Sequence, residues 1–281
     1  MTADVERRLR HISAGLAPAR AWASDPGWIL VLGSATLVWA LATFKPDPFR
    51  RIFFFLLDGV LVTFQLTIIS FLFILLVGLI GGVGRIVKNP VMRGLASLYV
   101  EIVRGIPLMV QLLFIWFALP QVLDFLGQAL LNRVPSLGQA LIELSFSPFV
   151  AAVTGLTICY GAYMSEIVRA GIESIPHGQM EAARSLGMSY VQAMRYVILP
   201  QALRVVLPPS GNEFVALLKD SALVSVLAVS DLTRRGREYM ARTFLSLETW
   251  AMVALIYLVL TLFFARIVAL IEKKMDTEEA R

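Results

Sequence analysis

Two acid–base pairs stand out in an otherwise apolar sequence. Glu101 and Arg104, and likewise Glu166 and Arg169, place a carboxylate three residues before a guanidinium, so each pair is expected to share one face of a helix. We interpret Glu101 as one half of a charge pair that anchors a membrane edge. For Glu166 two roles stay open, because a carboxylate inside a span is costly and by default suggests a pathway or a ligand. It either anchors an edge or binds the amino group or cationic side chain of a substrate.

A second candidate is the run Lys219-Asp220-Ser221, which interrupts another apolar stretch. Pro208-Pro209, eleven residues earlier in the chain, is expected to break the helix, and broken helices often bind substrates in transporters. Lys219 could then meet a substrate carboxylate. Alternatively, Lys219 pairs with Asp220 or reaches back to the membrane edge. Gln111 and Asn212 are weaker lining candidates, since single polar residues in spans more often bond a neighbouring helix.

The composition identifies an integral membrane protein. The chain has 281 residues, of which 58% are hydrophobic and only 16% are charged, against roughly a quarter charged in soluble domains. The net charge of +5 is modest and fits cytoplasmic membrane edges better than nucleic-acid binding. Cys159 is the only cysteine and there are two histidines, so neither an intrachain disulfide nor a His/Cys metal cluster is expected.

The uncharged runs predict an all-α membrane protein with about six transmembrane helices. We expect spans at 28–44, 59–84, 105–123, 144–165, 201–230 and 249–265. Pro107 is expected to interrupt the third of them. A basic leader (1–27) precedes them, external loops (45–58, 124–143 and 231–248) connect them, and a tail (273–281) follows. The internal segments carry more Arg and Lys than the external ones, which predicts that both termini are cytoplasmic. An alternative for 28–44 is a signal peptide cleaved near Ala40-Leu41-Ala42.

Residues 174–200 are too polar to cross a bilayer, although apolar segments flank them. Apolar side chains recur there at helical spacing, and Gly187 divides the pattern into two short helices. Pro176 is expected to open the first helix and Pro200 to close the second. Such an amphipathic pair either docks into a groove of a partner or lies on the membrane surface.

The same segment resembles the EAA loop of ABC importer permeases. The matching residues are Glu181-Ala182-Ala183, then Gly187, and finally Leu199-Pro200. Val197 stands where the family usually has Ile. The resemblance implies that these residues form the coupling element that inserts into a groove of a cytoplasmic ATPase.

Residues 99–112 resemble, more narrowly, the Arg-Gly-x-Pro-Leu-x-x-Gln signature of polar amino acid permeases. Arg104, Gly105, Pro107 and Gln111 fall on that signature, and Glu101 precedes it. The family core has five transmembrane helices and covers roughly 59–272 here. The resemblance therefore implies a five-helix type I importer fold, with 28–44 as an extra leading helix.

The sequence contains no Gly-x-x-x-x-Gly-Lys phosphate loop. The resemblance therefore implies a transport subunit that is not itself an enzyme and binds no cofactor, with ATP and Mg on separate ATPase chains. The other expected partners are a second permease subunit, identical or paralogous, a soluble amino-acid-binding protein and a polar amino acid, at the bacterial inner membrane. The rival classes are a secondary transporter driven by an ion gradient and a membrane scaffold that transports nothing.

Overall fold

The structure is a computed structural model, and it describes residues 26–279. Most of the predicted leader (1–27) and the last two residues of the tail lie outside the described residues. Every regular element of residues 26–279 is helical, which agrees with the predicted all-α class. The elements are α2 (Pro26–Phe44), η1 (Pro46–Arg50), α3 (Arg51–Ile86), α4 (Pro90–Gly105), α5 (Leu108–Leu113), η2 (Phe114–Ala118), α6 (Leu119–Leu130), α7 (Pro135–Glu143), α8 (Pro148–Glu173), α9 (His177–Ser185), α10 (Tyr190–Ala193), η3 (Met194–Ile198), α11 (Leu199–Asp220), η4 (Ser221–Leu227), α12 (Leu232–Thr243) and α13 (Ser246–Glu279).

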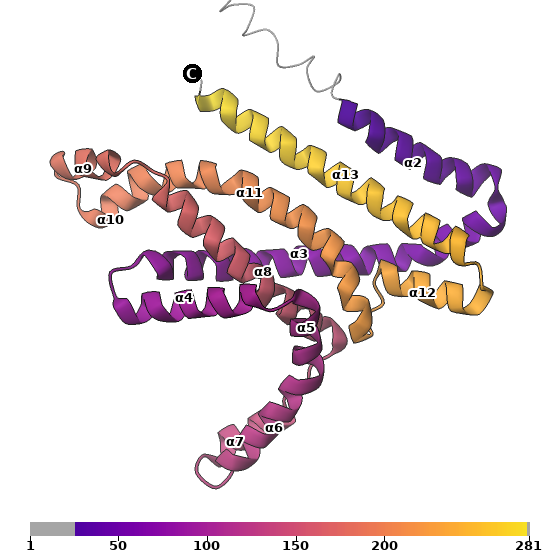
Figure 1. Ribbon diagram of the computed structural model, residues 1–281, viewed down its shortest axis with the longest axis horizontal. Helices are drawn as coiled ribbons and strands as arrows, with labels where there is room; N and C mark the ends of the chain where they lie inside the picture. The colour runs from indigo at the N-terminus through magenta and orange to yellow at the C-terminus, as the bar shows by residue number, and fades with distance from the viewer. Residues whose placement is uncertain (1–25, 280–281) are drawn as a thin grey trace, which may run out of the picture.

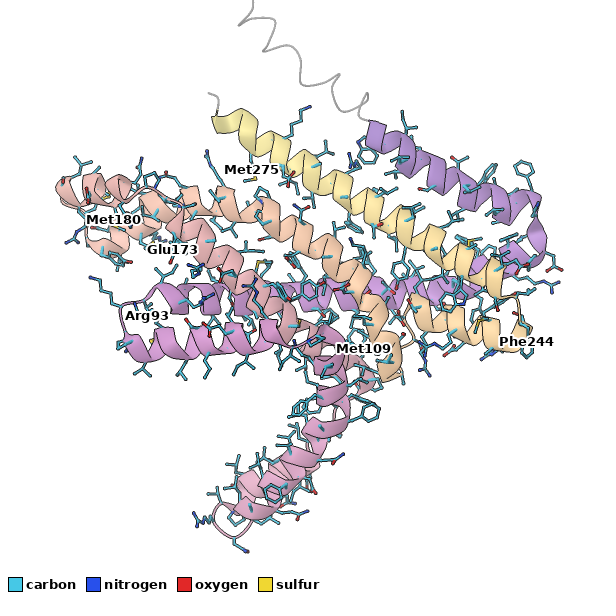
Figure 2. The ribbon with its side chains drawn as sticks, viewed as in Figure 1. Arg93, Met109, Glu173, Met180, Phe244 and Met275 are labelled. Atoms are coloured by element: carbon cyan, nitrogen blue, oxygen red, sulfur yellow. The ribbon has the colours of Figure 1, made fainter. Side chains whose placement is uncertain are left out.

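The long helices run in broadly the same direction and form one body (Figure 1). Helices α9 and α10 lie at one end of this body and α12 lies near the other, while α6 and α7 project away from it. Arg93, Glu173 and Met180 lie toward the same end, and Phe244 lies at the opposite end (Figure 2). The α3–α4 turn and the 174–200 segment therefore share one side of the protein, as the charge pattern predicted.

The centre of the body is the contact between α3 and α8. Glycines on α3 at positions 78, 81 and 82 face side chains of α8 so closely that added side chains would collide. A Cβ on Gly82, for example, would lie 2.6 Å from the Cβ of Val168. Small residues let helices in a membrane approach closely. The largest buried cluster adjoins this contact and includes Leu66, Ile74, Leu112, Leu156, Met164, Leu217 and Leu227.

The predicted leading span is present as α2, which packs against α13. Val38 of α2 joins Ile52, Met252 and Ile256 in a second buried cluster. The opposite face of α2 carries exposed apolar side chains such as Leu30 (62% exposed). A helix with one packed face and one exposed apolar face fits the edge of a membrane bundle.

Five described helical segments are long and apolar enough to cross a membrane: 27–44, 47–86, 108–130, 148–173 and 246–275. Helix α11, which covers most of the predicted fifth span (201–230), is not among them, because Arg204, Glu213, Lys219 and Asp220 lower its hydropathy. It nevertheless packs between α8 and α13 inside the body. Glu213 and Asp220 of α11 are half-buried, whereas Arg204 and Lys219 are exposed.

The three segments predicted as loops are largely helical, whereas the sequence predicts only a short amphipathic piece within 124–143. Helix α3 begins at Arg51 rather than near residue 59. Residues 119–143 form a helical hairpin of α6 and α7, in which the Gly127 and Gly138 backbones are in close contact. In the third, α12 begins at Leu232. The carboxylate of the preceding Asp231 caps it by accepting hydrogen bonds from the amides of Thr233 and Arg234, both at 3.1 Å. Such capping offsets the polar composition that suggested a loop.

The sequence predicts that Pro208-Pro209 kinks or unwinds the helix, and the structure contradicts the unwinding. Helix α11 continues through both prolines, because close packing on both sides holds it: Gly171 of α8 faces Val206, and Gly211 faces Val268 of α13. The helix changes instead after Asp220, where η4 is a 3-10 helix that ends at Ala228 with a φ of 66°. The irregular backbone thus lies directly after Asp220 rather than before it.

Candidate functional site

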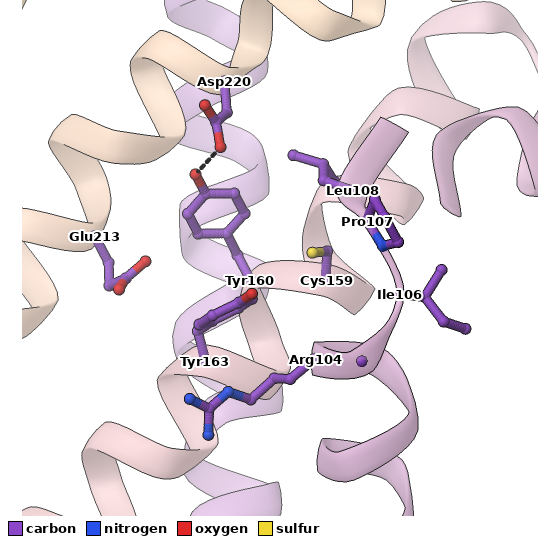
Figure 3. Close-up of a pocket in the computed structure, with 10 residues that line it drawn as sticks. Arg104, Ile106, Pro107, Leu108, Cys159, Tyr160, Tyr163, Glu213 and Asp220 are labelled. Carbon is purple, nitrogen blue, oxygen red and sulfur yellow. Dashed lines mark hydrogen bonds between the residues drawn. The ribbon is translucent and has the colours of Figure 1, made fainter. Parts of the chain in front are cut away.

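A cavity of about 460 Å³ lies where the end of α4, the middle of α8 and the end of α11 meet (Figure 3). Arg104 and Gly105 enter it from the end of α4, and Glu213 and Asp220 come from α11. The remaining lining residues are Ile106, Pro107, Leu108, Cys159, Tyr160 and Tyr163. Three charged side chains therefore share one cavity in the interior of a helical bundle.

The wall formed by residues 104–108 exists because the helix is interrupted there, as Pro107 predicted. Ile106 has extended backbone (φ −109°, ψ 132°) between α4 and α5. The Gln111 side-chain amide donates to the carbonyls of Val103 and Ile106, both at 2.8 Å. Gln111 is thus buried behind this wall and does not line the cavity, contrary to its predicted lining role. It thereby satisfies the Ile106 carbonyl at the helix break and adds a second donor to the Val103 carbonyl, which also accepts from the Ile106 amide at 3.4 Å.

The charges in the cavity are arranged on two sides. The Tyr160 hydroxyl donates to the Asp220 carboxylate at 2.7 Å, and Glu213 lies two turns earlier on the same helix. Arg104 reaches across from the other side, and its guanidinium lies 5.1 Å from the centre of the Tyr163 ring (Figure 3). An anionic side and a cationic side in one cavity match the two charged groups of a zwitterion.

Glu166 does not line the cavity; it lies in an ion-pair network on α8, beside Arg104. It forms ion pairs with Arg85 of α3 and with Arg169, and Arg169 also pairs with Glu173. The Arg104 Nη1 lies 4.0 Å from the Glu166 Oε2. The predicted Glu166–Arg169 couple is therefore present. The predicted pairing of Arg104 with Glu101 is not, because Arg104 turns toward Glu166 and Glu101 is exposed.

Of the remaining predicted pathway residues, Asp220 lines the cavity, whereas Lys219, Ser221 and Asn212 do not. Lys219 and Asn212 are exposed, and Asp220 accepts from Tyr160 rather than pairing with Lys219 as one alternative proposed. Ser221 is buried, and its hydroxyl donates to the Leu218 carbonyl at 2.8 Å. Their positions follow from the helix turn: residues next to Asp220 in sequence point in other directions.

Sequence reasoning missed Glu213 and the two tyrosines as members of this site. Glu213 and Asp220 are seven residues apart, so they lie on one face of a continuous helix. That signal was hidden by the expectation that Pro208-Pro209 unwinds the segment. Tyr160 and Tyr163 are three residues apart on α8 and likewise share a face. Two tyrosines at this spacing do not by themselves distinguish a binding site from ordinary helix packing.

The 174–200 segment forms a separate feature at the end of the body. Pro176 precedes α9 as predicted, and Gly187 adopts a φ of +84°, which confirms the predicted bend. The Met188 amide donates to the Ala183 carbonyl at 3.2 Å across this bend. Ser189 and Gln192 then form a reciprocal cap for α10, a pairing that fixes a helix start.

Pro200 does not close the second helix, so that prediction was wrong. The chain continues through η3 directly into α11, and Pro200 lies in the first turn of α11, where a missing amide hydrogen is tolerated. The 174–200 segment is therefore joined to the rest of α11 by continuous helical backbone, with no loop between α10, η3 and α11.

The apolar side chains of this segment point in two directions. Ala183, Ala193 and Ile198 are buried, and α9 and α10 pack mainly on each other and on η3. Others are strongly exposed, namely Leu186 (81%), Val191 (71%) and Tyr196 (63%). Glu181 and Ala182 of the motif are exposed as well, while Leu199 is half-buried. An exposed apolar surface on a polar helical segment is typical of a protein-interaction site.

Residues 74–277 match the family of binding-protein-dependent transport system inner membrane components. That range contains both the cavity and the 174–200 segment, and it is most of the chain. The chain belongs to this family. Its structural features can therefore be read as those of a permease component.

Two characterised relatives agree with this assignment. The chain is 36% identical over 220 residues to the glutamine transport system permease protein GlnP of Escherichia coli K12, covering 78% of this chain and 92% of the relative. It is 34% identical over 224 residues to the L-cystine transport system permease protein TcyB of Bacillus subtilis, covering 79% and 87%.

Solved structures show the same fold. One is an amino acid ABC transporter crystallised with histidines, with a TM-score of 0.67 and 35% identity over 84% of this chain and 97% of that one. The MetNI methionine ABC transporter in an inward-facing conformation gives a TM-score of 0.59 at 23% identity, over 80% and 98%. The predicted ABC importer permease fold is confirmed, and α2 lies before the residues that the family match covers.

Proposed function

We propose that this protein is the permease subunit of an ATP-driven importer for a polar amino acid at the bacterial inner membrane. The main support for this proposal is the cavity, which has Arg104 on one side and Asp220 and Glu213 on the other. A free amino acid presents a carboxylate and an ammonium group, and charge-assisted hydrogen bonds to both would hold it. The relatives named for glutamine and cystine transport support the same class.

Residues 174–200, called the coupling segment from here on, support the proposal that transport is driven by ATP hydrolysis. The exposed apolar side chains of this segment suit docking into a groove of a cytoplasmic ATPase, and the motif residues Glu181, Ala182, Ala183, Gly187, Leu199 and Pro200 lie in it. The ATPase chains would hold ATP and Mg, since the sequence lacks a phosphate loop. Both termini would be cytoplasmic, on the side of the coupling segment.

A second permease subunit and a soluble amino-acid-binding protein complete the proposed assembly. ATP binding would draw the two coupling segments together, and the rigid bundle would rock the cavity from the inner to the outer side of the membrane. Because α11 is continuous with η3, such a movement would reach Glu213 and Asp220 without an intervening flexible loop.

The test begins with affinity purification of the tagged protein in mild detergent and identification of the ATPase, permease and binding-protein chains that accompany it. Uptake of labelled glutamine, histidine, arginine and cystine is then measured in proteoliposomes that contain the complex. We expect uptake that requires internal ATP. Uptake driven by a proton or sodium gradient alone would instead support a secondary transporter, and no uptake under any condition would support a scaffold.

The cavity itself is tested in the same vesicles with Asp220→Asn. Loss of an ionic contact should raise the substrate concentration for half-maximal uptake about tenfold or more, since hydrogen bonds to charged groups contribute roughly 1.5–3 kcal/mol. Asn212→Ala is the matched control, because Asn212 is exposed on the same helix outside the cavity. Equal effects of the two substitutions would place the substrate elsewhere.

A further inference from the structure

Arg104 belongs to two groups of residues that otherwise do not meet. It lines the cavity with Asp220 and Glu213. It also lies 4.0 Å from Glu166, which is outside the cavity. No other lining residue of this cavity makes an ion pair in the described part of the chain. Arg104 is therefore the direct electrostatic connection between the cavity and the Glu166 network.

The contact between Arg104 and Glu166 is the loosest in that network. Arg169 Nε lies 3.3 Å from the Glu166 carboxylate, and Arg85 and the Arg169 Nη2 approach still more closely. The Arg104 side chain is 42% exposed, whereas that of Arg85 is 15% exposed. Glu166 would thus keep two close partners without Arg104, and the Arg104 side chain has room to turn.

Glu166 is also well placed to influence the coupling segment. It lies on α8, which continues as one helix to Glu173, and α9 begins at His177 directly after Pro176. Its partner Arg169 pairs with Glu173 in the last turn of α8. A change of charge balance at Glu166 therefore acts eight residues, slightly more than two helical turns, before the segment proposed to dock the ATPase.

We propose that Arg104 is a positioning residue that reports substrate occupancy to the coupling segment, a proposal that rests on the cavity being the substrate site. In the empty cavity Arg104 shares the Glu166 carboxylate with Arg85 and Arg169. A substrate carboxylate in the cavity attracts the guanidinium, and Arg104 leaves Glu166. Glu166 then pairs with Arg85 and Arg169 alone. One positive charge has thus left the contact between α3 and α8, close to the start of the coupling segment.

The test uses the complete reconstituted complex with its ATPase chains and binding protein. The ATPase rate is measured with and without a saturating mixture of the standard L-amino acids, and the ratio of the two rates is the readout. Arg104→Gln and Glu166→Gln should each lower this ratio at least about fivefold, the lower end of typical coupling between sites. The ratio in the double variant should be no lower than in the more severe single variant, because both substitutions break the same contact between Arg104 and Glu166.

Two further variants separate this role from a structural one. Glu173→Gln is the matched control, because it removes a carboxylate partner of Arg169 without touching Arg104, and its ratio should stay close to that of the wild type. Arg104→Lys should restore part of the ratio, since it keeps the positive charge. If Glu166→Gln does not assemble, the contrast between Arg104→Gln and Arg104→Lys decides the question.

Several outcomes would overturn the proposal. One is that the losses from Arg104→Gln and Glu166→Gln multiply in the double variant. Another is that Arg104→Gln raises the half-saturating substrate concentration while the ratio at saturation stays intact, which would make Arg104 a binding group only. An unchanged half-saturation in Asp220→Asn would instead refute the cavity as the substrate site, so the two failures are distinguishable.

Discussion

The cavity and the coupling segment are both polar interruptions of an apolar chain, but they treat their side chains in opposite ways. At the cavity, polar groups find partners within the protein: Asp220 accepts from Tyr160, and Gln111 satisfies the broken end of α4. At the coupling segment, Leu186 and Val191 are strongly exposed apolar side chains. The first region thus pairs polar side chains inside the protein, whereas the second presents apolar side chains at its surface.

This difference indicates where substitutions act. A change at the cavity should alter what is bound and leave assembly intact, because the helices around it pack through other residues. A change at the exposed face of the coupling segment should alter assembly and leave the isolated permease folded, because those side chains contribute little to its own packing.

The strongest test of this contrast is the double substitution Leu186→Asp with Val191→Asp. Two carboxylates in place of apolar contacts should weaken ATPase association about a hundredfold or more, since burying each apolar side chain contributes roughly 1.5–3 kcal/mol. Co-purification with the ATPase, followed by titration of the complex, measures the loss. Val91→Asp is the control: Val91 is 67% exposed at the start of α4, on the same side of the protein. Retained association in the double variant would contradict the docking role.

A smaller effect is expected from the shape of the segment alone. Gly187 has a φ of +84° with open space around it, so a side chain there is strained by the backbone rather than by a collision. Gly187→Val should weaken ATPase association roughly tenfold, because left-handed backbone costs a non-glycine residue about 1–2 kcal/mol. The dissociation constant of the detergent-solubilised permease for its ATPase is the measurement.

Two further variants separate the effect of the backbone conformation at Gly187 from the effect of adding a side chain. Gly187→Asn should be milder, because Asn tolerates left-handed backbone better than a branched residue. Gly178→Ala is the matched control, since Gly178 lies in α9 with equally open surroundings and no positive φ. Equal binding by all three variants would mean that the bend does not shape the docking surface.

The sequence predicted features that depend on a few adjacent residues. The bend at Gly187 and the interruption at Pro107 follow from local backbone preferences, and both are present. The prediction failed where packing overrides local preference. Pro208-Pro209 lies inside a continuous helix because α8 and α13 hold α11 on both sides, and composition alone cannot show that support.

The candidate site was predictable only in part for the same reason. Arg104 and Asp220 stood out by charge within apolar runs, but their approach to one cavity depends on how α4 and α11 meet on α8. The pairing of Glu166 with Arg85 joins residues 81 positions apart. Such contacts are set by the glycine-rich packing of α3 on α8, and a pattern search within one helix does not reveal them.

The smallest expected effect comes from a substitution in the cavity. Tyr160→Phe removes the hydroxyl that donates to Asp220 at 2.7 Å and leaves the ring in place. The carboxylate loses one donor and its orientation becomes less fixed, so the half-saturating substrate concentration should rise a few-fold, in keeping with roughly 0.5–1.5 kcal/mol for one hydrogen bond. Tyr99→Phe is the control. The Tyr99 hydroxyl, on α4, donates at 2.7 Å to the carbonyl of Ile158, which lies on α8 as Tyr160 does. Neither Tyr99 nor Ile158 lines the cavity. ATPase association should be unchanged in both variants. If Tyr160→Phe weakened ATPase association without altering uptake, the division between a ligand-binding interior and a protein-binding exterior would have to be abandoned.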